Sequence, residues 1–134
     1  MSTTSLECVI AGLNYLNANY ANWELQLYQT SHVLLNADNL ATYTALIATY
    51  PVYAPQALAA AAGAVNDGSG NALAAFGAYT FTTTGASANI IYGCYIEDTV
   101  LGVLIGAVQF TTPVDMTGLG NQCIVTLSDT LLTA

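Results

Sequence analysis

The sequence contains no lysine and no arginine among its 134 residues. Its eight carboxylates and single histidine give a formal net charge of −8. Binding to nucleic acid draws much of its affinity from cationic side chains that displace counterions from phosphates, so we expect no nucleic-acid partner. For the same reason we expect no attachment to an anionic membrane surface. Phosphate-bearing substrates are also disfavoured, because neither a cation nor a Gly-rich phosphate loop is present to hold them.

Charged residues are scarce at 6%, whereas hydrophobic residues make up 54% of the chain. This balance is the reverse of the composition of disordered proteins, so apolar side chains must pack inside the chain or between copies. No apolar run approaches the ~20 residues that span a bilayer, and no basic segment precedes an apolar stretch. We therefore expect a single domain over residues 1–134, with no membrane span and no signal peptide.

Cysteine is present three times, as Cys8, Cys94 and Cys123, without CxxC spacing. An odd number in this arrangement predicts neither a disulfide framework nor a zinc site. We expect buried thiols that act as small apolar side chains. Cys94 and Cys123 can meet if they lie on neighbouring strands, although synthesis in a cytosol would keep them reduced.

The first segment with a clear periodicity is TSLECVIAGLNYLNANY. Its apolar residues recur at helical spacing, and Thr4 with Glu7 has the form of a capping box. The pattern predicts an amphipathic helix over about residues 4–17, whose apolar face requires a partner. That face consists of Leu6, Val9, Ile10, Leu13 and Leu16.

The rest of the chain, about residues 23–130, predicts a β-rich body. WELQLY at 23–28 alternates apolar and polar residues with the period of a half-buried strand. NLATYTALIATY at 39–50 predicts a short helix that begins near Asp38 or Asn39 and stops before Pro51. Further strands are predicted near residues 58–61 and at 76–83, 89–97, 101–110 and 122–128.

Turn residues separate these strands. NDGSGN at 66–71 and MTGLGN at 116–121 predict turns, and the few residues around Glu97 to Val100 predict an antiparallel hairpin. The expected fold class is therefore mainly β, an antiparallel β-sandwich or barrel preceded by an N-terminal amphipathic helix.

Residues able to perform chemistry are few. His32 is the only histidine, so no pair of histidines can hold a metal, and we expect a solvated loop residue rather than a catalytic base. A Ser/His/acid triad is an alternative that composition leaves open, although no GxSxG frame singles out one of Ser31, Ser69, Ser87 and Ser128. Glu97 and Asp98 are adjacent in a predicted strand and would point to opposite faces, which disfavours acid–base catalysis. A calcium site formed by the oxygens of residues 66–71 is an alternative to simple turn formation. We expect no catalytic residue, no metal and no cofactor.

The nine tyrosines are scattered, which argues against a carbohydrate-stacking platform. Tyr92 and Tyr95 fall on opposite faces of one predicted strand because their offset is odd. Tyrosine is favoured at protein interfaces. We therefore predict that Tyr92 and Tyr95, together with Leu6, Val9 and Leu13 on the helix, contribute to an interface, with the protein core as the alternative location.

The order of short motifs resembles small structural proteins of tailed bacteriophages. IYGCYIED followed by VLGVLIGAVQFTTPVDMTGLGNQCIVT is similar to their strand ending in an IYGYxVxD-like sequence, an apolar strand, a PV-x-M turn and a final strand. WELQLYQ resembles their LxLY strand, and YAPQALA resembles a segment that precedes a Thr-rich strand. Gln29 and Ile105 stand in regions where such proteins usually carry basic residues.

This resemblance implies a non-enzymatic virion protein, foremost a decoration or cement protein on the outer surface of the capsid. Its expected partner is the major capsid protein, it is expected to be a homotrimer, and it would be made in the host cytoplasm. A strongly acidic protein is repelled by packaged DNA, which favours an external position. The alternatives are a tail, baseplate or receptor-binding virion protein and, in a different class, a small hydrolase or calcium-dependent binding protein.

Overall fold

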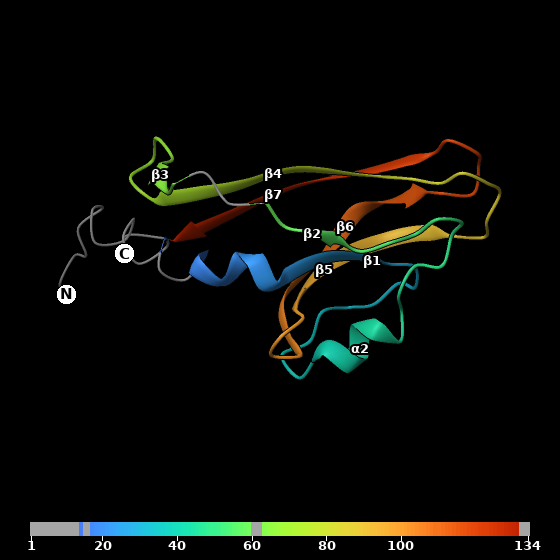
Figure 1. Ribbon diagram of the computed structural model, residues 1–134, viewed down its shortest axis with the longest axis horizontal. Coiled ribbons are helices and arrows are strands. Elements are labelled where there is room, and N and C mark those ends of the chain that lie inside the picture. The colour runs from blue at the N-terminus through green and yellow to red at the C-terminus, as the bar shows by residue number, and fades with distance from the viewer. Residues whose placement is uncertain (1–13, 15–16, 60–62, 132–134) are drawn as a thin grey trace. The chain divides into compact units, whose positions relative to one another are not determined.

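The computed structural model describes residue 14 and residues 17–59 and 63–131 of the chain (Figure 1). This part is mainly β, as predicted, and its two sheets are antiparallel and do not close into a barrel. The predicted helix over residues 4–17 lies almost wholly outside the described residues. A 3-10 helix, η1 (Asn17–Asn22), leads directly into the first strand.

The strands form one four-stranded and one three-stranded sheet. The first has the order β2 (Gln56–Ala57), β1 (Trp23–Tyr28), β5 (Ile90–Asp98), β6 (Val103–Asp115). The second has the order β3 (Val65–Asn66), β4 (Ala72–Thr82), β7 (Gln122–Leu131). Strands β1 and β5 therefore occupy the centre of the larger sheet, and β6 forms one of its edges.

The chain divides into two compact units. One contains β3, the first part of β4 and the last part of β7. The other spans residues 22–57 and 79–125 and contains the whole four-stranded sheet together with the short helix α2 (Leu40–Thr44). The surfaces and contacts described below all belong to this second unit unless stated otherwise.

The predicted elements agree with the observed ones to different degrees. Strand β1 has the predicted bounds, and α2 begins after Asn39, whose side chain forms a capping box with Thr42. The helix ends at Thr44, earlier than predicted, because the chain turns at Ala45 and Ile47 forms a bridge to Tyr28. The strand predicted near residues 58–61 is wrong for Leu58 and Ala59, since pairing with β1 involves the preceding Gln56 and Ala57.

Both faces of β1 are covered. Leu25 and Leu27 are fully buried, as the alternation predicts, but so is Tyr28 on the opposite face. Tyr28 packs with Tyr43 of α2 and Tyr95 of β5, with ring centroids of the Tyr28–Tyr43 and Tyr43–Tyr95 pairs 5.5 and 5.4 Å apart. The helix thus contributes to a tyrosine cluster that covers the face on which the sequence pattern indicated solvent.

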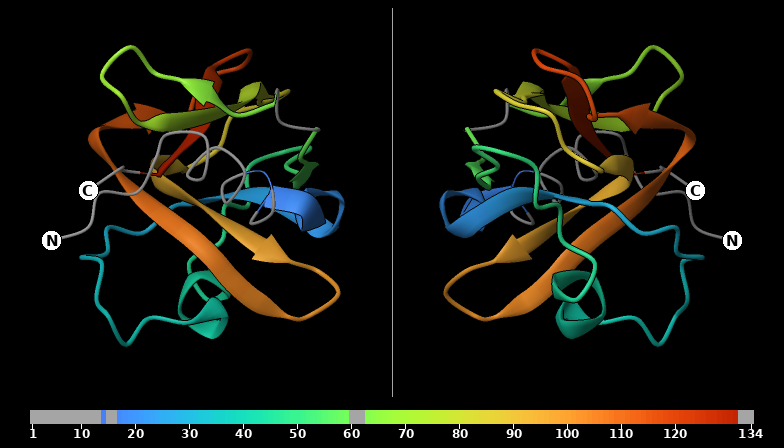
Figure 2. Two further views of the ribbon diagram at one scale, coloured as in Figure 1. Left: turned by 90° about the vertical axis from the view of Figure 1, so that its left-hand side faces the viewer. Right: turned by 90° about the vertical axis from the view of Figure 1, so that its right-hand side faces the viewer.

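The predicted hairpin connects β5 and β6 (Figure 2). Asp98 ends β5, and its Oδ1 accepts hydrogen bonds from the backbone N–H groups of Val100 and Leu101 at 2.9 and 2.8 Å. Gly102 takes a φ of 65°, in the region that favours glycine, and its N–H donates to the Asp98 carbonyl. Asp98 therefore stabilises the hairpin turn through its side chain and its backbone carbonyl.

We expect Asp98→Ala to lower the free energy of unfolding by about 2 kcal/mol, because two backbone donors lose an acceptor that is 2% exposed. Urea denaturation followed by circular dichroism measures the change. Asp67→Ala, in the first unit, is the matched control, since Asp67 Oδ1 also accepts from two backbone N–H groups but Asp67 is solvent-exposed. An equal loss in both variants would contradict the role assigned to burial of Asp98.

Candidate functional site

The most exposed apolar surface of the larger sheet lies on the β5–β6 hairpin and along β6. We call it the β6 surface; its exposed apolar residues are Val100, Leu101, Val103, Ile105 and Val108. Val100 is 72% exposed and Val108 54%. A group of exposed apolar residues on one hairpin is a candidate surface for contact with another molecule.

Strand β6 is also an unpaired edge. It pairs with β5, and no other described strand pairs with it. Natural proteins usually protect such an edge with charged residues, especially lysine, or with proline. Between Val103 and Val114 there is no charged residue, and Pro113 lies near the end of the strand. The stretch from Val103 to Thr112 therefore carries neither a charged residue nor proline. Its irregularities are Ile105 and residues 110–113, which have no partner on β5.

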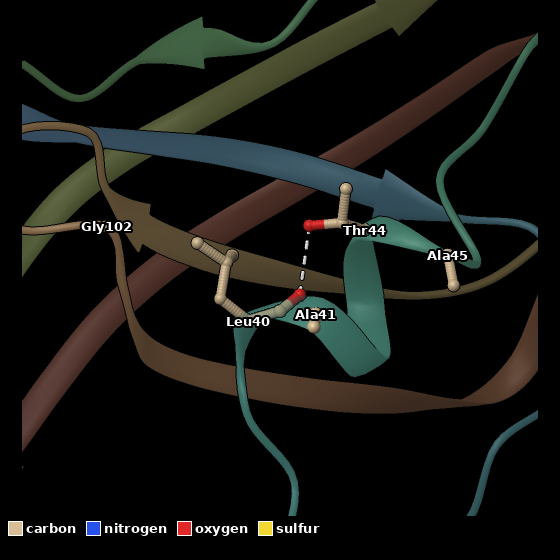
Figure 3. Close-up of a pocket in the computed structure, with 5 residues that line it drawn as sticks. All are labelled: Leu40, Ala41, Thr44, Ala45 and Gly102. Atoms are coloured by element: carbon tan, nitrogen blue, oxygen red, sulfur yellow. Dashed lines mark hydrogen bonds between the residues drawn. The ribbon is translucent and has the colours of Figure 1, made fainter.

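A shallow depression adjoins the hairpin turn (Figure 3). Leu40, Ala41, Thr44 and Ala45 of the α2 segment line it on one side, and Gly102 lines it on the other. The Thr44 hydroxyl donates to the Leu40 carbonyl at 2.9 Å, so its hydrogen is already used within the helix. The lining offers apolar contact area and no ionisable group, which suits an apolar side chain of a partner better than a polar substrate.

Carboxylates lie near both ends of strand β6. Asp115 ends β6 and is exposed, and the Thr117 hydroxyl and backbone N–H hold its pKa below the ordinary value. At the other end, Glu97 is the cross-strand partner of Leu104 on β6 and of Glu24 on β1. Burial and the Glu24 carboxylate raise the pKa of Glu97. No lysine or arginine exists in the chain to balance these charges.

Glu97 belongs to a short polar network inside the sheet. The Gln26 side-chain amide donates to Glu97, and the Tyr95 hydroxyl donates to the Gln26 oxygen at 3.0 Å. The pairing register places all three on one face, since Gln26 is opposite Tyr95 and Glu24 is opposite Glu97. Two glutamates directly opposite each other are destabilising, and the Gln26 hydrogen bond partly offsets that cost.

His32 is half-buried and not the fully solvated residue that the sequence suggested. Its Nε2 lies 2.8 Å from Asp38 Oδ2, and the same oxygen accepts hydrogen bonds from the Tyr43 hydroxyl and the Leu35 backbone N–H. These bonds, the Leu35 N–H foremost, hold the pKa of Asp38 below its ordinary value. These hydrogen bonds to Asp38 hold the loop before α2 against the tyrosine cluster. None of the hydrogen bonds of the described residues joins a serine hydroxyl to His32.

The predicted interface residues have different locations. Leu6, Val9 and Leu13 lie outside the described residues. Tyr95 is 1% exposed in the tyrosine cluster, and burial raises its pKa to about 12. Tyr92 is half-buried and packs against the same cluster, next to a register shift between Ile91 and Gly93. The simple alternation that would separate the two tyrosines does not hold across this irregularity.

The other candidate sites consist of structural contacts. In the turn at residues 66–71, which belongs to the first unit, Asn66 and Asp67 oxygens accept hydrogen bonds from backbone N–H groups within the turn. The Ser87 hydroxyl donates to the Met116 carbonyl at 2.8 Å. Within the described residues, no three His, Cys, Asp or Glu side chains are grouped so that they could hold a metal ion.

Cys94 and Cys123 are buried free thiols, as predicted for both. They lie on β5 and β7, which are strands of different sheets. Burial raises their pKa values to about 12 and about 11, and in Cys94 the nearby Cys123 adds to the effect. The thiolate is the reactive form, so these residues are poor nucleophiles at neutral pH. Cys8 lies outside the described residues.

Comparisons with protein-family models, curated proteins and solved structures find no match to this chain. Separately, none of the helices in the described part of the chain is long and apolar enough to cross a membrane.

Sequence reasoning identified the β5–β6 hairpin but missed the β6 surface as a candidate site. The signal was present: residues 99–114 form a run of sixteen without a charged side chain. The interpretation of this run depends on strand order, because a central strand with the same residues would be hydrogen-bonded to a neighbouring strand on each side. Only the placement of β6 at the edge of the sheet makes the run a candidate contact surface.

Proposed function

We propose that this protein is a non-enzymatic virion component of a tailed bacteriophage that decorates the outside of the capsid and bridges neighbouring capsid subunits. The observation that supports this function best is the β6 surface, an exposed, charge-free apolar strand edge on an otherwise acidic protein. An edge of this kind is suited to binding another protein through apolar burial and main-chain hydrogen bonds. The motif order of β5 to β7 gives the resemblance to phage structural proteins.

The proposed virion protein has a sandwich fold and a trimeric assembly. In this proposal the two antiparallel sheets form a β-sandwich, and the amphipathic helix predicted over residues 4–17 is retained. The protein forms a homotrimer at junctions of the major capsid protein, and it contacts neither DNA nor membrane. Its negative charge supports an external location because packaged DNA repels it.

The test is the copy number of this protein relative to the major capsid protein in purified virions, measured by quantitative mass spectrometry. Chymotrypsin is required, because trypsin finds no lysine or arginine to cleave after. We expect a ratio near one trimer for each local junction of capsid subunits. A few copies per virion would support a tail, baseplate or receptor-binding role, and complete absence from virions would refute the proposal.

A further inference from the structure

We infer that the free edge of β6 binds an extended segment of a different protein, apolar in its middle and carrying lysine or arginine at both ends. This inference rests on the proposed function, in which the partner is the capsid protein, and it specifies the kind of segment that is bound. The stretch from Val103 to Thr112 provides backbone groups for strand addition, most regularly over Gly106 to Gln109, where β6 pairs with β5 without interruption. Pro113 has no N–H and marks one end of the pairing.

The side chains along this edge determine the middle of the partner segment. Val103, Ile105 and Val108 are exposed, and Leu104 and Ala107 are partly buried against the tyrosine cluster. A strand added beside β6 would lie about 4.8 Å away, so its side chains would contact these residues directly. An apolar middle buries this surface, whereas a charged residue there would lose its hydration without gaining a counterion.

The charges at the two ends determine the ends of the partner segment. Asp115 lies at one end of β6, and Glu97 lies beside Leu104 near the other. A basic partner side chain at one end would lie next to the exposed Asp115. At the other end, Glu97 lies on β5 and accepts a hydrogen bond from Gln26, so a basic side chain at the Leu104 level would attract it across β6. Complementary charges at the ends also fix the register of a strand whose middle is uniform.

A second copy of this chain fits the same edge poorly. In an antiparallel pair of β6 strands, Asp115 of one copy would come next to the Val103 end of the other, near its Glu97. In a parallel pair the two Asp115 residues would come together. Both arrangements bring carboxylates close, and the chain has no lysine or arginine with which to separate them. Like charges directly opposite each other are destabilising, so a basic partner is favoured.

The test uses the full-length protein and two synthetic nine-residue peptides of alternating valine and threonine. One peptide has lysine at both ends, and the other has glutamate at both ends. We expect the lysine-ended peptide to bind at least about tenfold more tightly, measured by fluorescence anisotropy at low salt. We also expect it to slow amide hydrogen exchange within residues 103–112.

A pair of matched variants locates the site. Val108→Lys places a like charge beside the peptide on an exposed position and is expected to weaken binding of the lysine-ended peptide by about tenfold. Leu119→Lys adds the same charge at a residue 75% exposed in the turn after β6 and is expected to bind like the unmodified protein. Circular dichroism and thermal melting verify that both variants are folded.

Several outcomes would overturn the inference. They are no binding of either peptide, equal affinity for both, protection of amides elsewhere, or equal effects of the two lysine variants. Dimers in sedimentation with residues 103–112 already protected would assign the edge to a second copy. If virions contain the protein at the expected ratio and the peptide experiment fails, the proposed function stands and the β6 edge is not the contact.

Discussion

Gly93→Ala is expected to lower the free energy of unfolding by about 3 kcal/mol, the upper part of the range for overpacking a filled core. A Cβ at residue 93 would overlap the backbone oxygen of Val108 and the hydroxyl of Tyr28. Tyr28 lies across Gly93, its cross-strand partner, and donates a hydrogen bond to the Val108 carbonyl at 3.3 Å. The obstacle is partly backbone, so a rotamer change cannot relieve it.

Gly106→Ala is the matched control for this experiment. Gly106 lies on the neighbouring strand β6, and a Cβ there would meet no atom within 4 Å. We expect its free energy of unfolding to stay within about 0.5 kcal/mol of the unmodified protein, as for most surface substitutions. Urea denaturation of both variants gives the comparison. Equal midpoints for the two would show that the close approach of Tyr28 to Gly93 does not exist in solution.

Raising the pH is expected to unfold the protein cooperatively between pH 10 and pH 12. Burial raises the pKa of four tyrosines from 10.0 to about 12, namely Tyr28, Tyr43, Tyr50 and Tyr95. A group with a raised pKa stabilises the folded state fully below its unfolded pKa, here 10.0, and that contribution is lost as the pH rises through the folded value. Tyrosinate absorbance and loss of the β-sheet circular dichroism should therefore change together.

Tyr43→Phe tests the source of this pH dependence. The variant keeps the ring in the tyrosine cluster but removes one ionisable group and its hydrogen bond to Asp38. Fewer protons should then be released on unfolding between pH 10 and pH 12, by about one. Ionisation of the tyrosines while the β-sheet signal persists would mean that these hydroxyls are open to solvent. An unchanged proton release in the variant would exclude Tyr43 as a contributor.

The sequence predicted local features of the fold well. Alternation in WELQLY located β1, Asn39 located the start of α2, and the short acidic connection located the β5–β6 hairpin. Each of these signals is contained within a few neighbouring residues. The strand predicted near residues 58–61 was wrong for Leu58 and Ala59 because an Ala-rich stretch has no strong local preference for a strand. The pairing with Glu24 and Leu25 of β1 placed the strand at Gln56 and Ala57 instead.

Features that depend on distant residues were not predictable from these patterns. The contact of His32 with Asp38 is local but forms because Tyr43 holds Asp38 against the tyrosine cluster. Tyr95 was predicted to lie at an interface because tyrosine is favoured there. In the structure it is buried beneath Tyr43, which α2 brings onto the face of the sheet opposite Leu25. The exposed edge of β6 depends on the order of four strands, which the hydrophobic pattern does not specify.

The central position of β1 constrains the order in which the chain can fold. Trp23 pairs with Asp98, and Tyr28 pairs with Gly93. The pairing of β1 therefore cannot form until β5, which is synthesised much later, is present. The β5–β6 hairpin closes through a short turn and can form first, because contacts close in sequence cost little loop entropy. Until β1 docks, the hairpin exposes a free edge on each side, and refolding rates should report the arrival of β1.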